Sequence, residues 1–192
     1  MIGGRKRVIA VRLTAYVDIN IIGDMSTQFR VNFDAQGQGE PEVPFRTTLL
    51  VRDCCLCLHL QRAARALARR FDLALKPTGL TNGQFSFLMS LNRPDSPGVP
   101  LATIGSVAEL LGMDRTTVTA AARILHRRDL LKFEVQPRDR RNKVLRLTAD
   151  GMRVLAAAVP IWTREHQQIE REMGVGAPER LRRDLRFVSR KR

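Results

Sequence analysis

The sequence predicts a mainly α-helical fold with one small β-hairpin, and three observations support that prediction. Residues 104–127 contain two helical patterns separated by a Gly-Met-Asp turn. Residues 132–147 contain two short strand patterns around a strongly basic tip. Helical patterns over residues 53–75 and 148–173 enclose this central region. The outer helices are therefore expected to position the central region.

Composition narrows the classes of function. The 192 residues have a formal net charge of +14, and a basic surface attracts polyanions, which favours nucleic acid over an anionic membrane surface. No apolar run approaches the roughly 20 residues of a membrane-spanning helix, so no membrane partner is expected. The cysteines Cys54, Cys55 and Cys57 form no disulfide framework of a secreted fold and suit a reducing compartment. We expect a cytoplasmic protein.

The chain divides into three parts. Residues 1–46 lack a sustained period and end in a stretch rich in Gly, Gln, Glu and Pro, so we expect a disordered or misassigned N-terminal extension. Residues 47–176 are assigned to the central domain and its outer helices. Residues 177–192 are assigned to a basic C-terminal tail that begins as a helix near Pro178.

The central helix pair has local boundary signals. Thr103 caps the first helix, and Gly112 is placed to end it in a left-handed conformation. Asp114 then caps a second helix, which buries Val118 and Leu125 and leaves threonines and arginines on another face. This is the pattern of a helix-turn-helix, and the hairpin that follows makes it a winged helix-turn-helix.

The second helix and the hairpin carry the candidate DNA contacts. A helix in the major groove presents its N-terminal residues to base edges, where Arg bridges guanine acceptors and Thr offers a hydroxyl and a methyl group. An Arg at the wing tip reaches the minor groove, and Asp139 is expected to pair with a nearby Arg. The alternative is an amphipathic helix and a hairpin whose charges are merely solvated. The predicted DNA-binding residues are Arg115, Thr116, Thr117, Thr119, Arg123, Arg138, Asp139, Arg140, Arg141 and Lys143.

The helix that begins after Thr148 has apolar residues at alternating steps of three and four up to Met173, which is the seam spacing of helix association. This spacing favours a dimer core at Trp162 and His166 over an aromatic binding box. Pro160 is expected to kink the helix, because proline removes a backbone donor.

Four motifs together resemble the MarR family of bacterial transcription regulators. They are Leu-Leu-Gly-Met-Asp-Arg-Thr-Thr-Val-Thr, Arg-Arg-Asp-Leu-Leu, Asp-Arg-Arg in the wing, and Leu-Thr-Ala-Asp-Gly after it. The resemblance covers about Cys54 to Met173. It implies a homodimer built from the first and last helices that reads a pseudo-palindrome, usually as a repressor released by a small ligand or an oxidant. It places the recognition-helix contacts on Arg115 to Arg123, and the wing contacts on Asp139 and Arg141.

Cys57 is the candidate redox residue. Its position 22 residues before Gly79 resembles that of the sensing cysteine in the peroxide-sensing branch of the family. A thiolate near a helix N-terminus is favoured by the helix dipole. That branch has two tyrosines near its thiolate, whereas the matching positions here are Phe71 and Asn82. The alternative is that the thiols are inert apolar side chains.

The same helix contains residues for two further kinds of site. A small aromatic or phenolic ligand is expected in a pocket lined by His59, Arg62 and Phe85, where Arg would bind a carboxylate or phenolate. A metal site from Cys54, Cys55, Cys57 and His59 is disfavoured, because a regular helix points these side chains to different sides. No metal and no cofactor are expected.

Catalysis has little support, because the chain has no phosphate-cradling Gly loop or nucleophile motif and only three histidines. We therefore predict a sequence-specific DNA-binding regulator and not an enzyme. A nonspecific architectural DNA-binding protein, using the basic C-terminal tail, is the first alternative. A thiol-based redox regulator using Cys57 is the second.

Overall fold

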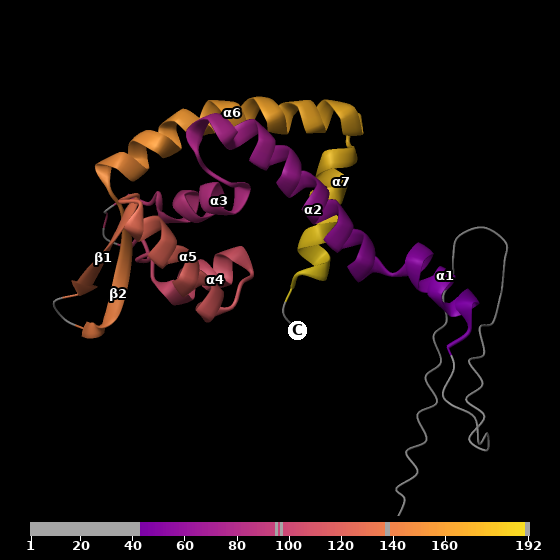
Figure 1. Ribbon diagram of the computed structural model, residues 1–192, viewed down its shortest axis with the longest axis horizontal. Coiled ribbons are helices and arrows are strands. Elements are labelled where there is room, and N and C mark those ends of the chain that lie inside the picture. Colours follow the sequence, from indigo (N-terminus) through magenta and orange to yellow (C-terminus); the bar gives the residue numbers. More distant parts are fainter. Residues whose placement is uncertain (1–42, 95, 97, 137–138, 191–192) are drawn as a thin grey trace, which may run out of the picture. The chain divides into compact units, whose positions relative to one another are not determined.

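The computed structural model describes residues 43–94, 96, 98–136 and 139–190. Within them the chain is mainly helical with a single two-stranded antiparallel sheet, as predicted (Figure 1). The elements in chain order are α1 (Phe45–Cys54), α2 (Leu56–Leu75), the 3-10 helix η1 (Lys76–Thr78), α3 (Asn82–Leu91), α4 (Ile104–Leu111), α5 (Arg115–Arg127), β1 (Leu131–Gln136), β2 (Asp139–Leu147), α6 (Ala149–Met173) and α7 (Ala177–Val188).

The chain separates into two compact units between Leu49 and Leu50. The second unit, Leu50–Arg192, contains every element from α2 onward. The expectation for residues 1–46 falls, up to residue 42, outside the described residues. None of the helices that the structure describes is long and apolar enough to cross a membrane.

The first predicted helix is interrupted. A single helix was expected over residues 53–75, but α1 ends at Cys54 and α2 begins at Leu56. Cys55 between them has extended backbone angles (φ −72°, ψ 105°), and its Sγ accepts a hydrogen bond from the backbone N–H of Leu58 at 3.5 Å. Cysteine sulfur is a weak acceptor and an uncommon cap, so the residue type gives little signal that a helix begins here.

One hydrophobic core joins the helices of the second unit to the sheet. Each fully buried aliphatic or aromatic side chain stabilises the fold by about 1.5–3 kcal/mol relative to its exposed state. The largest fully buried side chains come from α2, α3, α4, α5, both strands and α6, and they are Phe87, Leu75, Leu88, Leu125, Leu131, Leu145, Leu155, Val107, Val118 and Val144.

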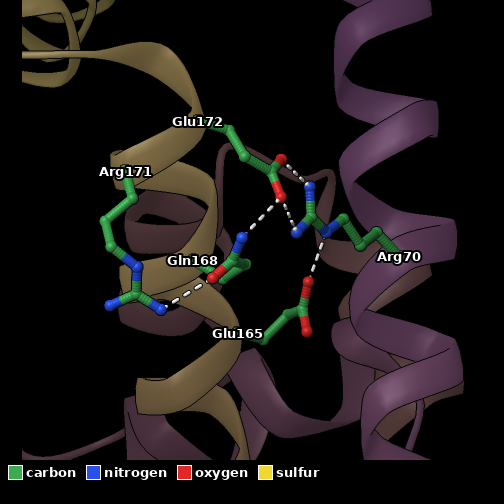
Figure 2. A network of polar contacts seen from close by, with 5 residues as sticks. All are labelled: Arg70, Glu165, Gln168, Arg171 and Glu172. Atoms are coloured by element: carbon green, nitrogen blue, oxygen red, sulfur yellow. Dashed lines mark hydrogen bonds and ion pairs between the residues drawn. The ribbon is translucent and has the colours of Figure 1, made fainter.

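Charged side chains hold α2 against α6 (Figure 2). The guanidinium of Arg70 on α2 donates to Glu165 and, through two nitrogens, to Glu172 on α6. Gln168 donates to Glu172 at 3.1 Å and accepts from Arg171 at 2.7 Å. The hydrogen bonds from Arg70 lower the pKa of Glu172 to about 2 and raise that of Arg70. The network therefore favours the charged form of both partners.

Trp162 of α6 packs inside its own chain. Its ring stacks on His166 with centroids 4.7 Å apart, and it lies 6.4 Å from Phe71 of α2 and 6.0 Å from Phe85 of α3. At Trp162 the predicted seam spacing therefore serves packing within the chain, and the dimer seam stays a prediction. Helix α6 continues through Pro160.

Candidate nucleic-acid interface

Caps fix both ends of α4 and the start of α5, and so define the turn between the two helices. Thr103 and Ser106 form a reciprocal capping box at the start of α4, with hydrogen bonds of 3.1 and 3.0 Å. Gly112 ends α4 with φ +64°, a left-handed conformation that glycine adopts without strain. Asp114 then caps α5 by accepting the backbone N–H of Thr117 at 2.7 Å. The two helices are joined as the sequence predicts.

Thr117 belongs to the cap. Its hydroxyl donates to the carboxylate of Asp114 at 2.5 Å, and this bond is the main reason why the pKa of Asp114 lies below its usual value. The hydroxyl of Thr119 donates to the backbone carbonyl of Arg115 at 2.7 Å, and Thr119 is half-buried. Thr117 and Thr119, both predicted DNA contacts, therefore donate their hydroxyl protons within α5 and its cap. The oxygen of each hydroxyl can still accept a hydrogen bond from DNA.

The outward face of α5 carries two other predicted readers. Val118, Ala122 and Leu125 are buried, with 0–1% of their surface exposed. Residues at helical positions about 180° from these three point away from the core. Thr116 and Arg123 occupy that face and are exposed, and neither side chain has a hydrogen-bond or ion-pair partner among the described residues.

Arg115 lies differently. It is exposed, but its guanidinium lies against Gly105 in the first turn of α4, where a Cβ on Gly105 would be 2.6 Å from Nη2. Gly105 was not among the predicted site residues. The local sequence gives no sign of the contact, because residues 105 and 115 lie on different helices.

The wing is the hairpin of β1 and β2, paired in register from Leu131↔Leu147 to Val135↔Lys143, with a bulge at Val135/Gln136. Lys143 is exposed. The predicted contact Arg138 lies outside the described residues. The backbone of β2 carries three more predicted contacts, Asp139, Arg140 and Arg141.

Two features of the wing were not predicted from the sequence. Glu134 on β1 bonds Lys132 at 2.7 Å and Arg146 of β2 at 2.6 Å, and these bonds, that of Lys132 first, hold the pKa of Glu134 below its usual value. In addition, Thr103 pairs with Val144 in a β-bridge, and the N–H of Leu145 donates to the carbonyl of Ala102 at 2.7 Å. The segment before α4 thereby anchors the wing through an isolated β-bridge.

The start of α6 packs against the segment that joins α5 to the wing. The hydroxyl of Thr148, which caps α6, donates to the carbonyl of Asp129 just after α5 at 2.5 Å. Gly151 in the first turn of α6 is buried, and a Cβ there would overlap the carbonyl oxygen of Leu130 and lie 2.8 Å from its carbon. This close approach fixes the start of α6 against the segment that joins α5 to β1.

Of the three predicted ligand-pocket residues, only Phe85 lines the cavity beside Trp162. Phe85 lines a cavity of about 380 Å³ together with Ser86, Met89, Ser90, Leu110, Val159 and Trp162. His59 and Arg62 are exposed on the first turns of α2 and do not line it. The Nε2 of His59 lies 3.0 Å from the carbonyl oxygen of Asp53 instead.

The cysteines gather where α1 meets α2. Cys57 is exposed in the first turn of α2, and its Sγ accepts from the side-chain amide of Gln61 at 3.2 Å. Of the two positions where the peroxide-sensing branch has tyrosines, Phe71 is buried beside Trp162, and the backbone N–H of Asn82 donates to Asp72 at 2.6 Å. Among the described residues no three or more His, Cys, Asp or Glu side chains are grouped to hold a metal ion.

Comparison with family models and with curated proteins finds no match to the chain. Solved structures do match. The transcriptional regulator MosR of M. tuberculosis, crystallised in complex with DNA, is 36% identical over 70% of this chain and 92% of its own, with a TM-score of 0.59. The transcriptional repressor CouR bound to a 23-mer DNA duplex is 28% identical over 73% of this chain and 96% of its own, with a TM-score of 0.63. A MarR mutant of E. coli, 18% identical over 74% of this chain and 99% of its own, shares the fold with a TM-score of 0.64. With its capped helix-turn-helix, its anchored wing and this degree of identity, the chain belongs to the MarR family of winged-helix transcriptional regulators.

Proposed function

We propose that the protein is a homodimeric repressor that binds a pseudo-palindromic operator through α5 and the wing. The observation that carries the proposal is the outward face of α5, where exposed Thr116 and Arg123 stand opposite a fully buried core face. A helix with such a face enters the major groove, and side chains without internal partners are free to bond base edges. The net charge of +14 supplies the attraction to phosphate. MosR and CouR, which share this fold, are seen bound to DNA.

Exposed apolar side chains on the outer helices support the dimer. Helix α7 exposes Leu181, Leu185 and Val188, which share one face of the helix, and α2 exposes Leu60 and Leu67. Apolar residues concentrated on one helix face in this way mark association surfaces. A dimer through these helices holds two copies of α5 about one DNA turn, roughly 34 Å, apart.

A salt-titrated anisotropy assay tests the proposal. The protein is expected to bind DNA from upstream of its own gene roughly a thousandfold more tightly than a scrambled duplex of equal length. Thr116→Ala and Arg123→Ala are expected to reduce this ratio, since each removes a base contact, and footprinting is expected to show one palindrome. Equal affinity for both duplexes at every salt concentration would instead support the architectural DNA-binding protein.

A small aromatic ligand is the proposed signal, and the cavity beside Trp162 is its proposed site. The rings of Phe85 and Trp162 offer it apolar surface, and Ser86 offers a hydroxyl. The structure of CouR from Rhodococcus jostii contains p-coumaroyl-CoA. Trp162 is the only tryptophan, so binding of hydroxybenzoates or hydroxycinnamates is expected to change the intrinsic fluorescence and release DNA. An unchanged spectrum and unchanged DNA affinity with every compound would refute the site.

A thiol signal at Cys57 is the second candidate, favoured by its exposure in the first turn of α2. Peroxide is then expected to release DNA from the wild type and from the control Cys54→Ser, but not from Cys57→Ser. Equal peroxide sensitivity of all three proteins would exclude the role of Cys57.

A further inference from the structure

The side chain of Arg115 has an arrangement that folding alone does not explain. Its guanidinium lies over the first turn of α4, with Nε and Cζ each 3.5 Å and Nη2 2.6 Å from the place where Gly105 would carry a Cβ. Arg115 is also the first residue of α5. A cation near a helix N-terminus is opposed by the partial positive charge of that terminus, and here two such termini are close.

No carboxylate of the described residues forms an ion pair with Arg115, and that of Asp114 is bonded to Thr117 instead. Arg115 is exposed and has no ion pair or hydrogen bond of its side chain there, whereas Arg70, Arg146 and Arg182 each meet at least one glutamate. The arrangement therefore leaves a cation available to an anion from outside the chain.

The direction of the Arg115 guanidinium favours a contact with a backbone phosphate over a contact with a base edge. Thr116 and Arg123 point straight away from the buried face of α5, which is the direction of base edges when a recognition helix enters the groove. Arg115 is one residue, or about 100°, from Thr116, and its side chain turns back over α4. In helix-turn-helix proteins the first helix crosses the sugar-phosphate backbone.

We infer that Arg115 contacts a backbone phosphate of the operator and does not read a base, and that Gly105 is the positioning residue that allows it. A methyl group on Gly105 would occupy the space of the guanidinium and push it off α4, whereas glycine leaves that space open. This inference rests on the proposed DNA-binding function and replaces the base-reading role that the sequence suggested for Arg115.

A double-mutant cycle tests the pair on the full-length protein. Arg115→Ala is expected to weaken binding to the operator and to scrambled DNA by the same factor, roughly tenfold, and to reduce the slope of log K against log salt by about 1 per binding site. Gly105→Ala is expected to cause part of that loss, roughly threefold, in the wild type and none in the Arg115→Ala background. Gly83→Ala is the matched control, because a Cβ at Gly83, also in the first turn of a helix, would meet nothing within 4 Å.

The outcomes separate the inference from the function on which it rests. If Arg115→Ala changes the ratio of operator to scrambled affinity, Arg115 reads a base and the phosphate role is wrong. If Gly105→Ala weakens DNA binding equally in the wild type and in the Arg115→Ala background, Gly105 does not position Arg115. The same conclusion follows if the control Gly83→Ala weakens DNA binding as much as Gly105→Ala does. If the wild type binds operator and scrambled DNA with equal affinity, the proposed function itself is overturned. Thermal melts keep the test interpretable, because Ala in place of a helical Gly is expected to preserve the fold.

Discussion

Gly151 shows how much one missing side chain contributes to this fold. Its Cα lies so close to the carbonyl of Leu130 that no other residue fits without moving backbone. Gly151→Ala is therefore expected to lower the free energy of unfolding by roughly 3 kcal/mol, since the strain falls on main-chain atoms. Urea denaturation measures the change.

Gly83→Ala is again the control, since its Cβ would meet open space. It is expected to be neutral or to stabilise by up to about 1 kcal/mol, because alanine favours helix more than glycine does. Similar losses in the two variants would show that the Leu130 contact is not the cause of the loss in Gly151→Ala.

Asp129 is a second residue with an unusual backbone. It follows α5 with φ +56°, a left-handed conformation that Asp tolerates better than β-branched residues do. Asp129→Gly is expected to be neutral or mildly stabilising, whereas Asp129→Val is expected to cost about 1–2 kcal/mol of unfolding free energy. Equal stability of the two variants in urea would contradict the assigned strain.

At the scale of the elements, the link between α2 and α6 gives the protein an acid sensitivity. The pKa of Glu172 is about 2 in the folded protein against an ordinary value of 4.5. A carboxyl whose pKa is lower when folded stabilises the fold above its unfolded pKa, and this stabilisation is lost as the pH falls through the folded one. The contribution is therefore complete above about pH 5 and decreases between pH 4.5 and 2.

Arg70→Met tests this assignment. Removing the guanidinium is expected to lower the melting temperature at pH 7 and to flatten its dependence on pH between 4.5 and 2. Arg69→Met is the control. Arg69 is exposed, and its side chain has no ion-pair or hydrogen-bond partner among the described residues. A pH profile of Arg70→Met parallel to that of the wild type would refute the role of Arg70.

The elements also show what the sequence predicts well. Asp114, Gly112 and Thr148 act through residues within one helical turn, so their roles are readable from neighbouring letters. The break at Cys55 was missed because sulfur is a rare cap. The β-bridge at Thr103 and the contact of Gly105 with Arg115 were missed because their partners lie on other elements, and spacing within one element does not identify them.

The predicted ligand-pocket residues lie apart because of the length of α2. His59 lies 12 residues before Phe71, the α2 residue that shares the Trp162 cluster with Phe85, which is roughly 18 Å along a helix. Residues that are all attractive for a ligand do not lie together merely because they belong to packed helices. Of the residues predicted from the sequence, Phe85 lines the cavity beside Trp162, and His59 and Arg62 do not.

At the scale of the whole molecule, α7 is expected to control assembly. Leu181→Glu with Leu185→Glu places two charges on its exposed apolar face and is expected to convert the dimer into monomers in analytical ultracentrifugation. Operator affinity is then expected to fall at least a hundredfold, since the two copies of α5 are no longer joined. Arg183→Glu on the opposite side of α7 is the control for charge. A variant that remains a dimer would move the interface elsewhere.

The close approach of Gly151 to Leu130 also fixes one end of α6 at a distance from the cavity beside Trp162. Because the first turn of α6 touches the main chain of Leu130, this end of α6 is held against the segment that joins α5 to β1. Trp162 lies 11 residues further along, roughly 17 Å away, where α6 borders the cavity. A ligand bound in this proposed site would therefore push on α6 at a point about three turns away from its fixed first turn.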